Sequence, residues 1–219
     1  MASGISILAP ASYAAQKLTR KQKKENQYLE TALSAFEMKQ YDTAIEYYTK
    51  AIELNPTNSE SYAKRANAKY LLGNYKDAVK DYTSALEIDP NQENIYYNRG
   101  IANTNLKAYD DVIADYTKEL EVNPKNINAY LNRGTTKVML NKFDEAISDF
   151  SKAIELDAKN EMAYYNRGIA KRCNKDYKGA LADYSKVIEL DSKSADAYNN
   201  RGVAKYYFCL LYTSPSPRD

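Results

Sequence analysis

The residues of this chain that could bind a ligand are repeated asparagines and arginines. Asn98, Asn132, Asn166 and Asn200 recur at intervals of 34 residues, and an arginine follows each of them directly. The pentapeptide YYNRG occurs identically at 96–100 and 164–168. An asparagine amide both donates and accepts hydrogen bonds, so one side chain can hold a peptide group through both of its polar atoms. The row therefore indicates recognition of a polypeptide backbone.

Composition gives little support to catalysis. The 219 residues include no His, which removes the commonest general base and the commonest metal ligand. Cys173 and Cys209 do not have metal or redox spacing, and no Gly-rich phosphate loop or nucleophile motif is present. Basic and acidic residues nearly balance, 31 against 29, and no apolar run is long enough for a membrane helix. We therefore expect a non-enzymatic, cytoplasmic protein that binds no cofactor, metal, nucleic acid or membrane.

The elements that must position the asparagines are helices. Apolar and small residues within each 34-residue unit fall at intervals of three and four, which is the period of an amphipathic helix. Polar residues or Gly near the middle of each unit, such as Gly73-Asn74, predict a break between two helices. A single helix pair cannot bury its apolar side alone, whereas a stack of pairs can.

This pattern resembles the tetratricopeptide repeat (TPR) family. The resemblance covers residues 25–208 and implies an all-α fold, an α-solenoid coiled into a right-handed superhelix. It rests on aromatic residues at positions 4, 17 and 24 of each unit and small residues at positions 8, 20 and 27. The expected units are 25–58, 59–92, 93–126, 127–160 and 161–194, with a partial unit at 195–208.

The resemblance places the first helix of each unit on the concave face, where the asparagines at position 6 would lie. Neighbouring first helices roughly 10 Å apart would meet about every third residue of an extended peptide, which rises about 3.3 Å per residue. Tyr97, Leu131 and Tyr165 at position 5 are candidates for side-chain pockets along this groove. The alternative is that the asparagines are solvated and the position-5 residues pack between helices. Glu30 and Lys64 occupy position 6 in the earlier units, so the row should be confined to 93–208.

The arginines suggest a structural role. Position 7 holds Arg in every unit after the first, and position 23 holds Asp in units two to five. The first unit lacks both, having Thr31 and Tyr47 instead. This shared absence predicts that Arg and Asp form a pair that fixes the helix register. A row of anion-binding arginines is the alternative, and the matching aspartates would largely neutralise it.

Some units depart from the pattern. Glu119 and Val112 stand where Ala is usual, which predicts looser packing of the third unit. Ala158 and Ser192 replace the Pro found at position 32 of earlier units, which predicts less sharply ended second helices in units four and five.

The two ends differ from the repeats. Residues 1–24 form a basic leader that runs into the first helix. Residues 209–219, CLLYTSPSPRD, resemble a translated sequencing adapter, so we expect them to be an artefactual tail that interrupts the sixth unit. The uncovered end of the stack predicts self-association there.

The function that these features favour is a protein-interaction scaffold that holds a partner's peptide in its groove. Two alternatives remain: the substrate-recruiting arm of a truncated multidomain enzyme such as a glycosyltransferase, and an RNA-binding helical repeat. Lys69, Lys137, Lys171 and Lys205 at position 11 form a basic row that would suit RNA. The carboxylate clamp of chaperone adaptors is not expected, because its cationic places hold Ala63, Asn128 and Asn132.

Overall fold

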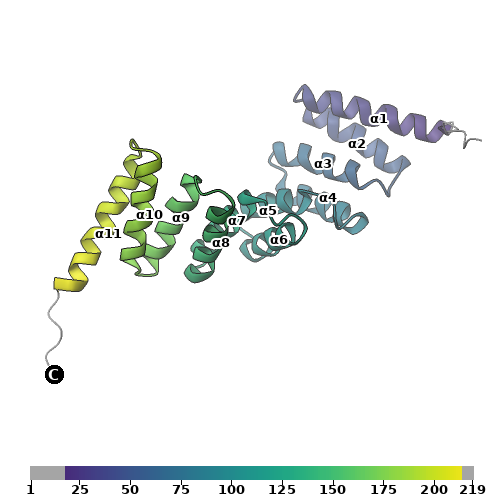
Figure 1. Cartoon of the computed structure of the whole chain (residues 1–219). Coiled ribbons are helices and arrows are strands. Elements are labelled where there is room, and N and C mark those ends of the chain that lie inside the picture. Colours follow the sequence, from purple (N-terminus) through teal and green to yellow (C-terminus); the bar gives the residue numbers. More distant parts are fainter. Residues whose placement is uncertain (1–17, 214–219) are drawn as a thin grey trace, which may run out of the picture.

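The computed structural model describes residues 18–213, and within this range the chain consists of helices joined by short loops. They follow one another as α1 (Arg20–Glu37), α2 (Tyr41–Leu54), α3 (Ser59–Leu71), α4 (Tyr75–Ile88), α5 (Ile95–Asn105), α6 (Tyr109–Val122), α7 (Ile127–Met139), α8 (Phe143–Leu156), α9 (Glu161–Cys173), α10 (Tyr177–Leu190) and α11 (Ala195–Thr213). Helices adjacent in sequence pack side by side, and the pairs stack into an elongated array (Figure 1). The all-α solenoid expected from the sequence is confirmed.

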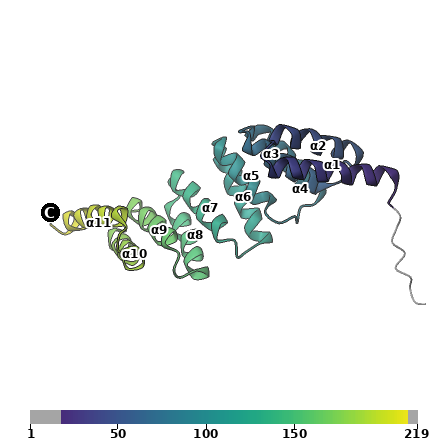
Figure 2. The ribbon, with the colours of Figure 1, turned by 90° about the horizontal axis from the view of Figure 1, so that it is seen from above.

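The array curves, and the view from above shows successive pairs rotating along its length (Figure 2). First helices also contact first helices of neighbouring pairs: α3 meets α5, α7 meets α9, and α9 meets α11. Elements on the inner side of a curved stack approach one another most closely. The odd-numbered helices therefore line the inner side, which we call the groove.

The core between the helices is built from small residues facing aromatic rings. Tyr48, Tyr82, Tyr116, Phe150 and Tyr184 at position 24 are at most 1% exposed. A Cβ atom built on Gly134 would lie only 2.8 Å from Cε1 of Phe150, so the missing side chain is what lets the ring enter. Most of the remaining core residues are Ala, which allows the helix axes to approach.

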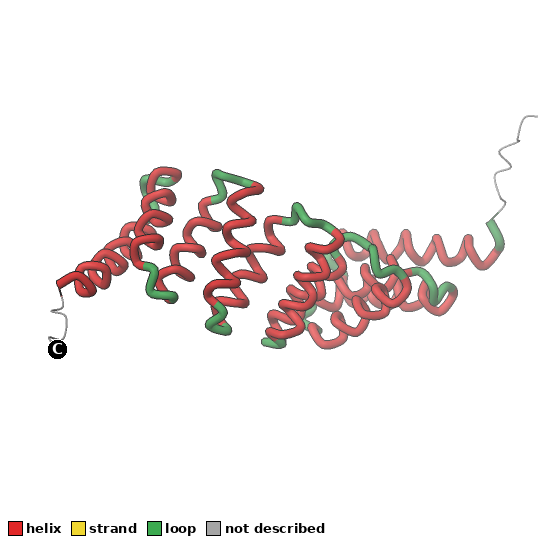
Figure 3. Tube along the Cα trace, turned by 60° about the horizontal axis from the view of Figure 1, so that its bottom comes forward, coloured by secondary structure: helices red, strands yellow, loops and turns green. Residues whose placement is uncertain are grey.

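In the turns between paired helices, drawn in green in Figure 3, one residue has the same left-handed backbone conformation. The residue at position 15 has a positive φ in each of the five pairs, at Lys39, Gly73, Lys107, Asn141 and Lys175. Only one of these is Gly, although Gly adopts this region most readily. Asn141 is of a type that tolerates this region, so the packing of the two helices imposes the turn on the three lysines.

The second helices of units four and five end as sharply as the others, contrary to the expectation from their missing prolines. The α8 and α10 helices stop at Leu156 and Leu190, the same position in the unit as Leu54 of α2. In both units the Asp at the C-terminal cap accepts a hydrogen bond from the backbone N–H two residues later: Asp157 from Lys159 (3.0 Å) and Asp191 from Lys193 (2.9 Å). This side-chain turn gives the backbone an alternative to continuing the helix.

The ends of the chain are only partly described. The α1 helix begins inside the basic leader, where the Thr19 hydroxyl accepts from the N–H of Gln22 and the Gln22 side chain accepts from the N–H of Thr19. The α11 helix continues past Phe208 to Thr213, into the stretch that resembles an adapter. Residues 1–17 of the leader and 214–219 of the tail lie outside the described residues.

Candidate peptide-binding groove

The asparagines at position 6 lie on the first helices but do not form a uniform row. Asn132 Nδ2 donates to the hydroxyl groups of Tyr97 and Tyr116, both at 3.3 Å. Asn200 Nδ2 donates in the same way to the hydroxyl of Tyr165, at 3.0 Å. In both places the amide N–H group of the asparagine is hydrogen-bonded to the tyrosine at position 5 of the preceding unit.

Asn98 and Asn166 differ, because their side chains form no hydrogen bond to any other described residue. The residue at position 5 explains the difference. Ala63 precedes Asn98 by one unit and Leu131 precedes Asn166, and neither carries a hydroxyl group. Asn98 and Asn166 therefore keep both a donor and an acceptor that no described residue uses, and they lie two units apart.

A pocket of about 290 Å³ opens beside Asn98. Its lining is mainly apolar and comes from the first helices α1, α3 and α5, with one ring from α4: Phe36, Asn67, Tyr70, Leu71, Tyr82, Asn98 and Ile101. The Tyr82 hydroxyl donates to Asn67 Oδ1 at 2.5 Å, which satisfies the buried end of that ring. An apolar lining with a few placed polar groups is the usual form of a ligand pocket.

The three position-5 candidates lie in different surroundings. Tyr97 and Tyr165 are partly buried, and each packs on the position-24 ring of its own unit. The ring centroids of Tyr97 and Tyr116 are 5.6 Å apart, and those of Tyr165 and Tyr184 are 6.0 Å apart. Burial raises the pKa of Tyr97, and it raises that of Tyr116 to about 12, so both hydroxyls stay protonated at neutral pH. Leu131 is 6% exposed and belongs to the core cluster around Phe150, so it packs between helices and offers little surface to a peptide.

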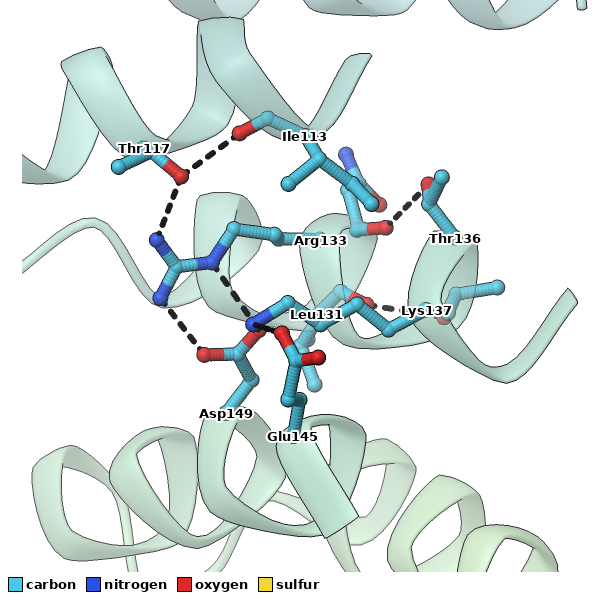
Figure 4. Close-up of polar contacts among 10 residues, drawn as sticks. Ile113, Thr117, Leu131, Arg133, Thr136, Lys137, Glu145 and Asp149 are labelled. Atoms are coloured by element: carbon cyan, nitrogen blue, oxygen red, sulfur yellow. Dashed lines mark hydrogen bonds and ion pairs between the residues drawn. The ribbon is translucent and has the colours of Figure 1, made fainter. Parts of the chain in front are cut away.

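The predicted Arg–Asp pairs are confirmed, and in each pair two nitrogens of the arginine donate hydrogen bonds to the aspartate. In the fourth unit Arg133 donates from Nε and Nη2 to the two oxygens of Asp149, at 3.0 and 2.6 Å (Figure 4). Arg133 Nη1 donates to the Thr117 hydroxyl on α6, which belongs to the preceding unit, at 2.9 Å. Three helices are thus joined through one guanidinium group. The same arrangement recurs around Arg65 and Arg167. Arg99 also joins three helices, but its Nε and Nη2 both donate to the same oxygen of Asp115, Oδ1.

Most of the lysines at position 11 form ion pairs with the same aspartates. Lys69, Lys137 and Lys171 form ion pairs with Asp81, Asp149 and Asp183 at 2.7, 2.9 and 2.8 Å, and their side chains are at most 19% exposed. The sequence-based interpretation of these lysines as a surface row for RNA is therefore wrong, with the exception of the exposed Lys205.

The third unit has a variant of this network. Asn103 takes the place of the lysine and donates to Asp115 Oδ2 at 2.9 Å, so among residues 18–213 Arg99 is the only cation on this carboxylate. Burial raises the pKa of Asp115, and the bonds from Arg99 and Asn103 offset only part of the rise.

Glu119, also in the third unit, is accommodated by hydrogen bonding rather than by loose packing. It is 1% exposed, and its two oxygens accept from the backbone N–H of Tyr97 (3.3 Å) and from Asn126 Nδ2 (2.8 Å). The α3, α7 and α9 helices are instead capped by an Asn side chain at the end of the preceding unit. The third unit is preceded by Gln92 at that place, and Gln92 Oε1 is buried without a hydrogen-bond partner among the described residues. The α5 helix begins two residues later in its unit, after Asn94, whose side chain makes no capping hydrogen bond. Glu119 therefore replaces the missing cap.

We expect Glu119→Ala to lower the free energy of unfolding by about 1–3 kcal/mol, because it leaves the N–H of Tyr97 and the amide of Asn126 unpaired. The double change Gln92→Asn with Glu119→Ala should recover part of this loss, since it lets α5 begin two residues earlier behind an asparagine cap, as α3, α7 and α9 do. Urea unfolding followed by circular dichroism measures the effect, and hydrogen exchange at the Tyr97 amide locates it. Glu121→Ala is the control, because Glu121 is 57% exposed and its ion pair with Lys118 is worth little. A double variant no more stable than Glu119→Ala would contradict the capping role.

Several functional residues were not predicted from the sequence. The Thr or Ser at position 25 that supports each arginine was missed, although Thr49, Thr83, Thr117, Ser151 and Ser185 recur at the same spacing as the arginines. Phe36, Tyr70 and Tyr82 of the pocket were missed because pockets depend on how the helices stack.

Stacked helix pairs with a groove lined by first helices define a helical-repeat scaffold. Sequence comparison gives the family: the family description "TPR repeat" matches residues 66–107, 136–171 and 174–206, and "Tetratricopeptide repeat" matches 27–58 and 47–80. The chain belongs to the tetratricopeptide repeat family. A comparison with curated protein sequences finds no match.

Solved structures share the fold. A crystal structure of MamA superposes with a TM-score of 0.75 at 22% identity, covering 80% of this chain and 95% of MamA. YrrB, described as a TPR protein with an unusual peptide-binding site, superposes with a TM-score of 0.73 at 21% identity, covering 84% of this chain and 98% of YrrB. A tetratricopeptide repeat protein from Parabacteroides merdae gives a TM-score of 0.74 at 20% identity, covering 89% of this chain and 81% of that one.

Two further properties bear on the class of function. Within residues 18–213, no helix combines the length and the apolar character needed to cross a membrane. The same part of the chain contains no group of three or more side chains suited to holding a metal ion.

Proposed function

We propose that this protein is a non-enzymatic scaffold that binds an extended peptide segment of a partner protein in its groove. The observation that carries the proposal is the juxtaposition of the free Asn98 amide with the apolar pocket formed by α1, α3 and α5. Asn98 would hold a backbone peptide group, and an apolar side chain next to that group would enter the pocket. The likeness to YrrB supports the fold on which this binding mode depends.

Asn166 gives the groove a second free amide further along the peptide. Asn132 and Asn200 would contribute less than the sequence suggested, because their N–H groups already bond Tyr97 and Tyr165. The ion-paired lysines weigh against RNA as the ligand, since a basic groove with accessible cations is what single-stranded RNA requires. The proposed setting is the cytoplasm, because neither cysteine has the spacing of a disulfide framework.

Selection of random peptides displayed on phage, followed by affinity measurement of the selected peptides, tests this function. We expect Asn98→Ala to weaken binding by about 3- to 10-fold, as befits one or two lost hydrogen bonds. Asn166→Ala should have a similar effect, and Asn132→Ala a smaller one. Asn91→Ala is the matched control, because Asn91 is an exposed loop residue.

Blocking the pocket should have a larger effect than removing an amide. Ile101→Glu places a charge in the apolar lining and should abolish the binding of peptides selected on the unchanged protein. Circular dichroism of each variant shows whether the helices persist. Peptides that bind Ile101→Glu and Asn98→Ala as well as the parent chain would exclude this groove as the site.

A further inference from the structure

A second pocket lies in the groove between α1 and α3, near the start of the array (Figure 1). We call it the N-terminal pocket. Its volume is about 170 Å³, and its apolar lining includes Leu29 and Leu33. Glu30 and Glu60 also line it, and both are exposed, which puts their carboxylates toward its open side. Glu30 occupies position 6 of its unit, the place that Asn98 has in the third unit.

The inner end of the N-terminal pocket carries two hydroxyl groups without partners. Ser61 is 1% exposed, and its Oγ is buried with no hydrogen bond to any described residue. The hydroxyl of Tyr48, an equally buried residue of the lining, forms no hydrogen bond within residues 18–213 either. Asn58 is already engaged, because its Oδ1 accepts from the N–H of Ser61 (3.1 Å) and its Nδ2 donates to Glu25 (3.2 Å). A polar group entering the pocket would therefore meet two free hydroxyl groups.

The fold itself does not require the Ser61 hydroxyl. Position 3 of the unit holds Ala129, Ala163 and Ala197 in units four to six, and all three are fully buried. A methyl group thus satisfies the packing at this position, whereas a buried hydroxyl without a partner is costly. The hydroxyl of Ser61 therefore points to a contact with a molecule from outside the chain.

The charges around the N-terminal pocket are negative on balance. Glu60 pairs with Lys64 at 2.7 Å, but both side chains are exposed, and such a pair contributes little. Glu30 forms no ion pair with any described residue. Burial and, after it, the carboxylates of Glu60 and Glu37 raise the pKa of Tyr48 to about 12. The hydroxyl of Tyr48 is therefore protonated at neutral pH and lies in a negative potential that favours a cation.

We propose that the N-terminal pocket binds an arginine side chain of the partner's peptide. The acceptors come from three helices, Glu30 from α1, Tyr48 from α2 and Ser61 from α3, and one guanidinium group offers five N–H donors to meet them. The apolar stem of the arginine would lie on the two leucines. Lysine fits less well, since its ammonium group is more strongly hydrated. The inference rests on the proposed function, because this arginine belongs to the peptide whose apolar side chain enters the pocket formed by α1, α3 and α5.

The chain's own basic leader is a weaker candidate for the occupant. Residues 1–17 contain one cationic side chain, Lys17. Lys17 precedes the helix cap Thr19 by two residues, whereas Glu30 lies about 16 Å further along α1, at a rise of about 1.5 Å per residue. A variant that starts at Leu18 separates this possibility from binding of a partner.

The test is a nuclear magnetic resonance titration of the complete, ¹⁵N-labelled chain with N-acetyl-arginine amide. We expect this probe to shift the amide resonances of Leu29, Leu33 and Ser61, with half-saturation at roughly 1–10 mM. N-acetyl-citrulline amide is the control probe, because it has nearly the same shape and no charge. It should bind at least about tenfold more weakly, since the charged hydrogen bonds to the carboxylates are lost.

Three substitutions in the chain should act in different directions. Glu30→Gln should weaken binding of the arginine probe by about 3- to 10-fold, and Ser61→Ala by about threefold without lowering the urea midpoint. Lys64→Gln should strengthen binding by about threefold, because it removes a competing cation. Glu53→Gln, at an exposed carboxylate of α2 outside the pocket, is the matched control and should bind normally.

The proposal fails if the citrulline probe binds as tightly as the arginine probe, or if Glu30→Gln and Ser61→Ala bind the arginine probe like the parent chain. It also fails if the variant that starts at Leu18 binds the probe more than about tenfold more tightly than the complete chain, since the leader is then the occupant. Loss of probe binding while selected peptides still respond to Asn98→Ala would refute the arginine pocket alone. A bound probe with peptides insensitive to Asn98→Ala would refute the proposed function instead.

Discussion

Replacing Asp149 by Ala is expected to lower the free energy of unfolding by about 3–5 kcal/mol. Asp149 is 4% exposed and accepts from both Arg133 and Lys137, whose side chains are only 15% and 10% exposed. Removal of the carboxylate leaves Arg133 buried without an anion and leaves Lys137 with only its longer ion pair to the exposed Glu145, at 3.5 Å. A buried unpaired charge is far costlier than a lost surface ion pair. Arg133 would also lose the partner that holds it between α6, α7 and α8, so adjacent units should loosen together.

Urea unfolding followed by circular dichroism measures this loss, and hydrogen exchange along α7 and α8 should place it at the fourth unit. Repeat arrays do not always unfold in one step, so the exchange data identify which helix pair opens first. Glu155→Ala is the control, because Glu155 pairs with Lys152 at 2.6 Å on the exposed surface, where such a pair is worth at most about 1 kcal/mol.

The triple change Arg133→Met, Lys137→Met and Asp149→Leu should be far less harmful than Asp149→Ala alone. Replacing a complete buried ion group by apolar residues removes the desolvation cost together with the attraction. A triple variant less stable than Asp149→Ala would contradict the view that the unpaired cations cause the loss.

Phe150→Ala is expected to cost about 3–5 kcal/mol through the cavity that it leaves. Phe150 is fully buried in the core cluster with Leu131, Ala146 and Ala153, and its ring edge lies against Gly134. The backbones of α7 and α8 are held apart by their other contacts, so the site cannot collapse onto the missing ring. Thermal and urea unfolding measure the loss, and Met162→Ala, at a residue 61% exposed, should change stability by less than about 0.5 kcal/mol.

The complementary change at Gly134 shows whether the energetic effects of the glycine and the Phe150 ring are coupled. Gly134→Ala places its Cβ 2.8 Å from Phe150 Cε1 and should destabilise by about 1–3 kcal/mol. In a Phe150→Leu background the same change should cost less, because the shorter side chain leaves room. Gly202→Ala should instead stabilise α11 by up to about 1 kcal/mol, since its Cβ has open space and Ala favours a helix. Equal costs of Gly134→Ala in both backgrounds would contradict this packing.

The Arg–Asp pairing shows what the sequence predicts well. Position 7 and position 23 change together in the first unit, to Thr31 and Tyr47, and the pairing inferred from this is present in each of units two to five. The helix periods were equally readable, because the small and aromatic residues recur in every unit. Helix ends were predicted less well: Pro was taken as the stop signal, whereas the Asp or Asn side chain one residue earlier makes the turn in units both with and without Pro.

The asparagine row shows where sequence analysis was incomplete. The four residues look equivalent in sequence, and only their neighbours in the preceding unit distinguish them. Leu131 and the lysines of position 11 were misplaced for a related reason, because exposure depends on which helix packs beside each side chain. Glu119 was taken as a packing defect, while the structure makes it the cap of α5 and a link to Asn126.

The sequence by itself determined the helices, their pairing and the family, because these follow from local periodicity that repeats in each unit. The tertiary structure alone decided which polar groups remain available, namely the amides of Asn98 and Asn166. Availability is a property of contacts between successive units, where a hydroxyl from Tyr97 or a carboxylate from Asp149 either reaches its partner or is absent. Identical motifs can therefore be structural in one unit and free to bind a ligand in the next.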